Sequence, residues 1–388
     1  MTVLNQIEAH RDGRQDKDAE APAEPEFSCV LALAANQVLA DPEFDAYLAE
    51  LASHCELIIV DGSPEGVFVA HHDRWPMARH VPVAGPTLMG KVGNVLTGVA
   101  LASHERVVIS DDDVRFGPEL RDLVARLEDA DLVRPQNYFG QLPWHAVWDS
   151  GRTLLNRFVG GDWPGTLAVR KSCLMEAGGY AGDVMFENYE LAKTVEAVGG
   201  RHLTASDIFI LRVPPDTDHF ISQRVRQAYD ELARPYRLVP FLSVLPTITY
   251  LVLRRRWTWL RRYATLGVVT VVGAAEVGRR RDGAVAYFPL RCTLAAPLWT
   301  LERALCVWLA LLAYVRGGVP YRGKRIRHAA LPRRERARRL APVARAFPTV
   351  IASHGHAGPG GSMLLGCVAY AAMRRPNDQE APSPQHGR

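Results

Sequence analysis

Apolar runs and amphipathic stretches alternate through the first third of the chain. Three runs are almost uninterrupted, as in parallel strands that are covered on both faces: Phe27–Ala35, Leu57–Val60 and Val107–Ile109. Helical spacing of apolar residues, with starts at Asp41-Pro42 and Gly117-Pro118, predicts helices between and after these runs: one from residue 42, one over 91–104 and one from residue 118. The alternation predicts an α/β fold.

Each predicted strand is followed by polar residues. Asn36 follows the first strand, Asp61-Gly62-Ser63 the second and Ser110–Asp113 the third. Because ligands of open α/β sheets bind at the carboxyl ends of the strands, we expect these three ends to face one pocket. In residues 131–231, glycine and proline clusters interrupt the helical pattern, which predicts a loop-rich half of the same domain.

The pattern changes after residue 236, where uncharged stretches alternate with arginine clusters. The stretches are Leu238–Leu253, Tyr263–Ala275 and Ala304–Val315. None has the roughly 20 residues needed to cross a bilayer, but flanking arginines can snorkel and extend the effective length. We expect membrane contact with at least one crossing. The alternative is a soluble helical subdomain with a basic rim.

Composition narrows the class of protein. With 388 residues and 48% hydrophobic content, the chain can bury a sizeable core. The six cysteines are scattered, without a Cys-x-x-Cys pair, which favours a reducing compartment and no structural zinc. Residues 316–345 carry eleven Lys or Arg and one acid, which suits anionic lipid headgroups; without interleaved aromatics, nucleic acid is not an expected partner.

The stretch VVISDDDVRF, residues 107–116, places three aspartates directly after a buried strand. In an extended chain Asp111 and Asp113 point to the same side, where one divalent cation would offset their repulsion. Mg²⁺ or Mn²⁺ bound by two carboxylates completes its shell with water and substrate phosphates, which implies a nucleotide diphosphate. The alternative is an acidic turn that caps the helix from residue 118.

Other polar residues are candidates for the same crevice. Asp61, at a strand end, could accept hydrogen bonds from a base or ribose. Lys91 and Asn94 lie one turn apart at the start of a predicted helix and could share a face toward the crevice. Asp162 and Trp163, before Pro164-Gly165, could line a sugar or acceptor pocket, or pack as part of a structural loop.

Taken together, the ordered motifs resemble those of the family 2 glycosyltransferases of the GT-A fold. The motifs are LALAANQ, IIVDGSP, KVGNVLTGVA, VVISDDDV, GTLAVRKSCLMEAGGY, FENYELAKTVEAVGGR and QRVRQAY, within residues 27–231. The apolar region and the late VPYRGKRI are similar to those of bacterial ceramide- and hopanoid-type lipid glycosyltransferases. The resemblance implies a Rossmann-like mixed sheet followed by membrane-associated helices.

The resemblance also implies a role for individual residues. Asp61 would contact the nucleobase or ribose. Apart from the resemblance, Lys91, Asn94 and Asp112 are candidates for donor binding from their place in the sequence. Asp111 and Asp113 would hold the metal and the diphosphate. Gln223 and Arg226 match the Gln-x-x-Arg-Trp motif near the diphosphate and the acceptor entrance, although Gln227 replaces the tryptophan.

One departure concerns the general base. The family usually places Glu-Asp before an aliphatic helix, with the aspartate as base, whereas this chain has Glu187-Asn188. An amide does not accept a proton at neutral pH, so we assign the base to Glu187, with Glu190 one turn away. A metal-binding but inactive relative is the alternative.

The predicted organisation has four parts: a disordered lead over 1–26, a transferase domain over 27–235, membrane-associated helices over 236–320, and a basic segment with a tail over 321–388. The expected enzyme transfers a sugar, preferably UDP-linked, to a lipid or glycan hydroxyl by metal-assisted single displacement. The expected location is the cell membrane, with the catalytic domain in the cytoplasm. A haloacid-dehalogenase-like phosphatase fits less well, because Arg115 occupies a motif position. A membrane-docked non-catalytic scaffold is the other alternative.

Overall fold

The computed structural model describes residues 26–340. Its centre is an eight-stranded sheet. From edge to edge the strands are β3 (Arg79–Pro82), β2 (Glu56–Asp61), β1 (Ser28–Leu33), β4 (Arg106–Ser110), β7 (Leu167–Arg170), β6 (Leu132–Phe139), β8 (His202–Arg212) and β5 (Val114–Arg115). The first four are parallel, β7 is antiparallel to both neighbours, β8 is parallel to β6, and β5 is antiparallel to β8. The predicted mixed α/β sheet is confirmed.

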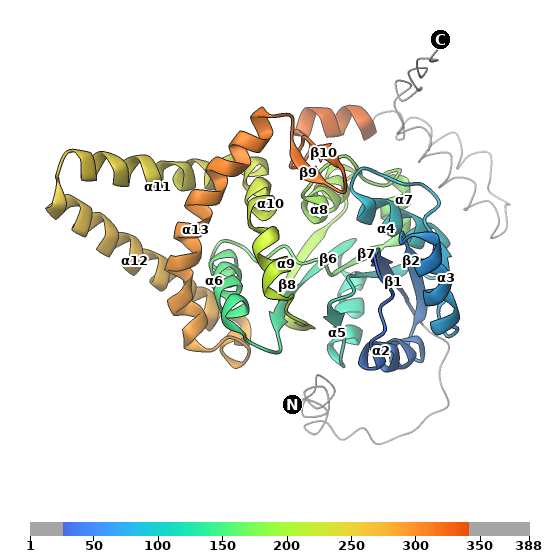
Figure 1. The fold of residues 1–388 in the computed structure, drawn as a ribbon. Helices are drawn as coiled ribbons and strands as arrows, with labels where there is room; N and C mark the ends of the chain where they lie inside the picture. The colour runs from blue at the N-terminus through green and yellow to red at the C-terminus, as the bar shows by residue number, and fades with distance from the viewer. Residues whose placement is uncertain (1–25, 341–388) are drawn as a thin grey trace, which may run out of the picture.

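Helices cover both faces of the sheet (Figure 1). On one face, α2 (Pro42–Ala52) and α5 (Glu119–Ala125) share a core with β1, β2 and β4. On the other, the core is shared by α4 (Gly90–Leu101), α7 (Lys171–Glu176) and α8 (Glu187–Ala197). A further helix that was not predicted, α3 (Glu65–Arg74), connects β2 to β3.

The first third of the chain folds as its pattern predicts. The Asp41 side chain accepts a hydrogen bond from the Glu43 backbone N–H at 3.0 Å, and Pro42 begins α2. The predicted apolar face of α2, Phe44, Leu48 and Leu51, is buried. Polar caps and apolar spacing therefore predicted this helix correctly.

The predicted loop-rich half over 131–231 is wrong. This region contributes β6, β7 and β8 to the sheet, together with α6 (Trp144–Phe158), α9 (Thr217–Ser222) and α10 (Arg224–Tyr229). The glycine clusters lie at the ends of elements: Gly160 and Gly161 follow α6 with φ of 109° and 103°. Such left-handed backbone is favourable for glycine, so these residues end helices rather than disrupt them.

Three long helices follow the sheet domain. They are α11 (Pro235–Leu253), α12 (Trp257–Arg280) and α13 (Leu290–Val315). In Figure 1 the first two form a hairpin that extends away from the sheet, while α13 runs along the domain and packs against α6 and α10. The uncharged stretches predicted from the sequence lie within these helices.

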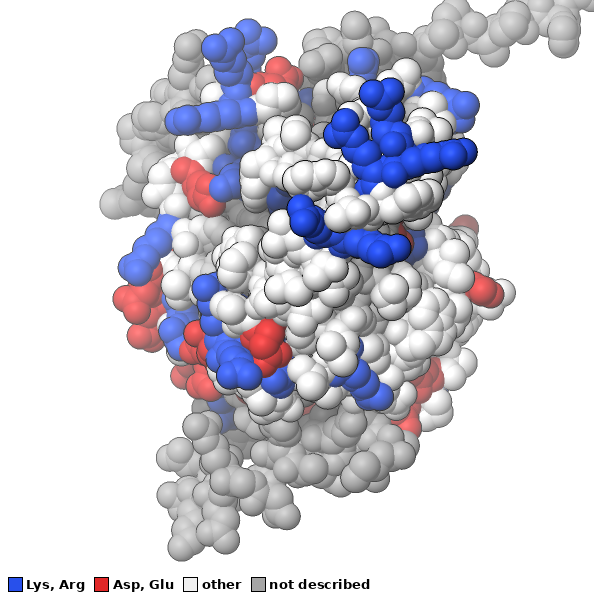
Figure 2. All heavy atoms as spheres, turned by 90° about the vertical axis from the view of Figure 1, so that its left-hand side faces the viewer, with Lys and Arg blue, Asp and Glu red and all other residues white. Residues whose placement is uncertain are grey.

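Within residues 26–340, α11 and α13 are long and apolar enough to cross a membrane. The most apolar part of α11 is entirely unburied, whereas one third of that of α13 is buried. Core helices of soluble proteins meet the same length and composition criteria. Figure 2 shows the molecule from the side on which the α11–α12 hairpin lies. Most of this surface is uncharged, and Lys and Arg side chains cluster in parts of it.

The basic segment is partly internal in the described region. β9 (Val319–Tyr321) and β10 (Lys324–Ile326) form a hairpin, and the chain then runs beside α8, where Met185 N–H donates to the His328 carbonyl. Arg336 and Arg339 pair with domain carboxylates rather than facing outward. The predicted lead over 1–25 and the tail over 341–388 lie outside the described residues.

Candidate active site

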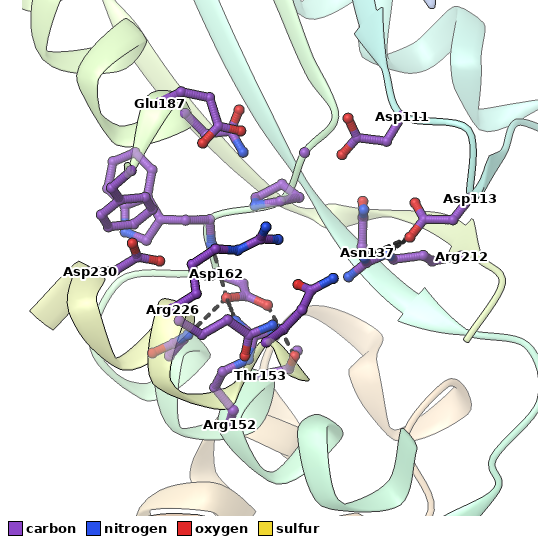
Figure 3. A pocket seen from close by; sticks show the side chains of 18 of the residues that line it. Asp111, Asp113, Asn137, Arg152, Thr153, Asp162, Glu187, Arg212, Arg226 and Asp230 are labelled. Atoms are coloured by element: carbon purple, nitrogen blue, oxygen red, sulfur yellow. Dashed lines mark hydrogen bonds and ion pairs between the residues drawn. The ribbon is translucent and has the colours of Figure 1, made fainter. Parts of the chain in front are cut away.

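One cavity of about 360 Å³ lies where β4, β6, α6, α8 and α10 meet. Seven of the predicted site residues, from four separate parts of the chain, line it: Lys91, Asp111, Asp112, Asp113, Glu187, Gln223 and Arg226. Figure 3 shows Asp111 and Asp113 on one side of the cavity, with Glu187 and Asp230 toward the other.

Asp111 and Asp113 each face a cation. Lys91 Nζ lies 2.6 Å from Asp111 Oδ1, and Arg212 donates from Nε to Asp113 Oδ2 at 2.7 Å. The second oxygen of Asp113, Oδ1, is buried and has no hydrogen-bond partner among residues 26–340. The Asn137 Oδ1 atom, in the same wall, is also buried without a partner. Two oxygen acceptors are therefore left unused at this end of the cavity.

These acceptors fit a hard divalent cation. Mg²⁺ and Mn²⁺ prefer carboxylate and amide oxygens, and buried polar atoms are rarely left unpaired. The helix-cap alternative is not supported, because no side chain caps the start of α5. Desolvation, followed by the charges of Asp113 and Asp111, raises the pKa of Asp112 to about 6.

Gly165 packs directly on the aspartate side chain. A Cβ atom at this position would lie 1.6 Å from Asp111 Oδ2 and 3.1 Å from Lys91 Nζ. Any other residue would therefore displace the Asp111 carboxylate or the loop. The loop that carries Asp162 and Trp163 thus fixes the position of Asp111 by close contact.

Glu187 begins α8 and points into the cavity. Its Oε1 atom lies 3.3 Å from Lys91 Nζ, so Lys91 joins Glu187 to Asp111. Glu190, one turn later, is completely buried and accepts hydrogen bonds from Arg336 Nε at 2.7 Å and from the Leu331 backbone N–H at 2.8 Å. Glu190 therefore has a structural role, and Glu187 is the carboxylate that reaches the cavity.

Gln223 and Arg226 lie on the opposite wall. Gln223 precedes α10 and contacts the His219 ring. The Arg226 guanidinium lies 5.7 Å from the centre of the Tyr321 ring, and no carboxylate pairs with it among the described residues. Arg226 is thus available to an anionic ligand from the cavity.

Asp61 does not line the cavity. Its side chain is buried, and Oδ2 lies 2.7 Å from His71 Nδ1 and 3.3 Å from His80 Nε2. Although burial opposes ionisation, hydrogen bonds from His80, Ser63 and His71 lower the pKa of Asp61 to about 2. The expectation that all three strand ends share one pocket is therefore wrong: the residues after β4 line the cavity, whereas Asn36 after β1 and Asp61 at the end of β2 do not, and Asp61 is covered by His71 and His80 from α3 and β3.

Asp61, His71 and His80 were not recognised as a group in the sequence. Their ligand atoms lie within 4.8 Å of one another, a spacing compatible with a metal ion. However, the Leu39 backbone N–H donates to His71 Nε2 at 3.0 Å, which places the ring proton on Nδ1, facing Asp61. We therefore assign these three residues as a hydrogen-bonded cluster.

Asn94 also lies away from the cavity. Its Nδ2 atom donates to the carbonyls of Leu33 and Val60 at 2.6 and 3.1 Å. The side chain therefore links α4 to the ends of β1 and β2. The expectation that Lys91 and Asn94 face the crevice together holds for Lys91 only.

The loop residues Asp162 and Trp163 line the cavity, and their contacts are internal. The Asp162 carboxylate accepts hydrogen bonds from Arg152, Thr153 and Asn156 (Figure 3). The Arg134 guanidinium lies 3.8 Å from the centre of the Trp163 ring. This network holds the loop against α6, which supports the structural alternative for Asp162.

Asp230 is a cavity residue that the sequence analysis missed. It follows α10 directly, and its side chain makes no hydrogen bond or ion pair within residues 26–340, although its backbone N–H donates to the Ala228 carbonyl. Burial, together with Glu187 and Glu231, raises its pKa to about 7, despite Arg234 and Arg303 nearby. In the sequence, the signal that could have identified Asp230 is its position one helical turn after Arg226. Asp230 therefore titrates in the range that suits acid–base chemistry.

Comparisons with known proteins give structural similarity only. No protein-family model matches the sequence, and no curated protein matches it. A mannosyltransferase from Pyrobaculum calidifontis, solved with GDP-Man and Mn²⁺, is 16% identical with a TM-score of 0.40, over 95% of this chain and 94% of that one. Glucosyl-3-phosphoglycerate synthase from Mycobacterium tuberculosis, solved with Mn²⁺, UDP and phosphoglyceric acid, is 20% identical with a TM-score of 0.36, over 58% and 80%. Because these scores are low, we transfer no residue role from either structure.

Proposed function

We propose that this chain is an inverting glycosyltransferase that moves a sugar from a nucleotide-diphospho-sugar to a hydroxyl acceptor. One observation carries the proposal: Asp113 Oδ1 is buried in the cavity without a hydrogen-bond partner, beside Asp111 and across from Arg226. An acceptor atom left unpaired in such a place suits a divalent cation that brings a diphosphate.

Asp111 and Asp113 would hold Mg²⁺ or Mn²⁺, with Asn137 beside them. When bound, the ion would neutralise the charge that grows on the leaving diphosphate. Lys91 would keep its positive charge next to the same diphosphate, because Asp111 and Glu187 flank its amine. Gln223 and Arg226 would bind the diphosphate from the opposite wall.

Glu187 is the proposed general base. Its carboxylate faces the cavity beside Lys91, and neighbouring Asn188 offers only an amide. Glu187 would take the proton from the acceptor hydroxyl as the oxygen attacks the anomeric carbon in line with the leaving diphosphate. A single displacement of this kind inverts the configuration at the anomeric carbon.

We further infer that the acceptor is a lipid and that the protein docks to the cytoplasmic face of the cell membrane. Large apolar side chains on α11, α12 and α13 are exposed, among them Leu253, Leu266 and Val315 at 76%, 67% and 75%. The cavity wall includes Arg234 and Arg237, where α11 begins, so this apolar surface starts next to the acceptor end. Arginines around such a surface would contact anionic headgroups (Figure 2).

The test is donor turnover by membrane preparations. We expect wild type to release nucleotide diphosphate from UDP-glucose or another nucleotide sugar in the presence of Mg²⁺ or Mn²⁺. Asp113→Ala should be inactive, and Glu187→Gln should be slow while still binding donor. The exposed Asp122→Ala on α5 serves as a matched control. A wild type that neither binds a nucleotide nor turns one over would contradict the proposal and favour the non-catalytic scaffold.

Membrane attachment is tested separately. We expect the protein to sediment with vesicles that contain anionic lipid and to resist extraction with high salt. Carbonate extraction then separates two attachments, because a crossing helix stays in the bilayer and a docked surface is released. A protein that remains soluble with every vesicle would contradict the membrane inference without affecting the proposed chemistry.

A further inference from the structure

Arg303 is a buried arginine in the middle of α13. The residue is 1% exposed and lines the cavity. Its Nε and Nη1 atoms are buried without any hydrogen-bond partner among residues 26–340. Its guanidinium carbon lies 4.9 Å from the centre of the Trp299 ring, which gives packing but no acceptor. A guanidinium in this state has donors available to a ligand.

The two acids whose charges act most on Arg303, Glu231 and Glu302, pair with other cations, although Glu231 Oε2 and Glu302 Oε1 are also buried without a hydrogen-bond partner among the described residues. Glu302, next in the chain, accepts a hydrogen bond from Trp148 Nε1 at 2.8 Å and faces Arg224 at 3.5 Å. Glu231 pairs with Arg234 at 3.3 Å and with Arg237 at 3.1 Å. Arg303 is therefore left out of the ion-pair network that surrounds it.

Other arginines of the cavity differ from Arg303 in this respect. Arg152 pairs with Asp149 and Asp162, and Arg212 pairs with Asp113. Arg226 lacks a carboxylate but is partly exposed, as expected for a residue at the donor side. Burying an arginine without a partner is unfavourable, and a bound anion would offset this cost.

We propose that Arg303 binds an anionic group of the acceptor, a phosphate or a carboxylate. The inference rests on the proposed function and adds one property to the acceptor: besides the hydroxyl that receives the sugar, the acceptor carries an anionic group. The planar guanidinium suits both groups because it can donate two parallel hydrogen bonds. Asp230, whose side chain is also unpaired, lines the same cavity as Arg303.

The anion could belong to a soluble molecule or to a lipid headgroup, and two arms of the experiment separate them. Purified full-length protein, saturated with UDP and Mg²⁺ to fill the donor side, is titrated with sn-glycerol 3-phosphate or with glycerol. In the second arm, the protein is mixed with vesicles of phosphatidylcholine alone or with vesicles of phosphatidylcholine and phosphatidylglycerol. Each arm compares wild type, Arg303→Met and the exposed control Arg121→Met.

We expect at least one anionic probe to bind wild type and Arg121→Met, and Arg303→Met to weaken that binding at least about tenfold. The neutral probes should show no difference between variants. In the free protein, the unfolding temperature of Arg303→Met should equal or exceed that of wild type, because an unpartnered buried charge is replaced by an apolar side chain.

Three results would overturn the proposal. They are equal binding of anionic probes by wild type and Arg303→Met, no preference for anionic probes in either arm, and a lower unfolding temperature of free Arg303→Met, which would reveal an internal partner. UDP affinity is measured in the same samples. If wild type binds neither UDP nor another nucleoside diphosphate, the transferase proposal fails, and the comparison of Arg303→Met with wild type still tests anion binding at Arg303.

Discussion

The two ends of the cavity differ in how their charges are satisfied. At the end proposed to bind the donor, Lys91 pairs with Asp111 and Arg212 pairs with Asp113. At the acceptor end, built from helices, Asp230 and Arg303 have no ion-pair partner among the described residues. The donor end is therefore held in place by its own ion pairs, whereas the acceptor end leaves a carboxyl group and a guanidinium group available to a ligand.

The largest effect is expected at the donor end. Asp111→Ala or Asp113→Ala should lower the rate of nucleotide-diphosphate release by about 10²–10³-fold or more, because charge stabilisation of the leaving group is lost. The rate is measured by nucleotide release from a labelled sugar nucleotide. If Asp113→Ala kept more than half of the wild-type rate, Asp113 would not stabilise the leaving diphosphate, and the assignment of the donor end would be wrong.

The next largest effect concerns the stability of α8, which packs against the segment that carries Arg336. Glu190 on α8 is buried against Arg336, so Arg336→Met should lower the free energy of unfolding by about 3–5 kcal/mol by leaving the Glu190 charge unpaired. Denaturant unfolding gives this value. The double variant Glu190→Met/Arg336→Met should recover much of the loss. An Arg336→Met protein as stable as wild type would mean that the C-terminal segment does not hold α8.

A smaller effect is expected from the loop that touches the donor end. Gly165→Ala should lower turnover about 10–100-fold, because its Cβ would overlap Asp111 Oδ2 and move the carboxylate. Gly267→Ala on α12 is the matched control, since a Cβ there meets no atom within 4 Å. Equal activity of both variants would show that Asp111 tolerates displacement.

The smallest effect is a change in how stability depends on pH. The pKa of Asp230 is raised to about 7, so its contribution to stability is fully present below its usual pKa and is lost as pH rises through 7. Asp230→Asn should therefore unfold at the same temperature as wild type near pH 4 and at a higher temperature at pH 8. Thermal unfolding across this pH range measures the effect. If the difference in unfolding temperature between Asp230→Asn and wild type does not change with pH, the Asp230 carboxyl is solvated and its pKa is not raised.

The same division describes what the sequence could predict. Apolar runs and the polar residues after them located β1, β2 and β4, and the residues that follow β4 lie at the cavity, as the direction of that strand predicts. Lys91 and Glu187 also reached the site, since each lies at the start of a helix. These features depend on local pattern and short spacing.

Features that depend on packing between distant segments could not be predicted. Asp61 is covered by His71 and His80 from α3 and β3, and its spacing alone gave no sign of this. Arg303 lies within an apolar helix that is long enough to cross a membrane, and only the fold shows that its side chain lines the cavity. Burial and missing partners are visible only when the helices are assembled.

The most direct test of the account is calorimetric titration of UDP into purified wild type and Asp113→Asn, with Mg²⁺, with Mn²⁺ and without either metal. The account predicts that UDP binds wild type only when a metal is present, and that Asp113→Asn loses affinity by about 100-fold or more under the same conditions. UDP binding that is independent of metal, or unchanged in Asp113→Asn, would contradict the assignment of Asp111 and Asp113 as the metal–diphosphate site.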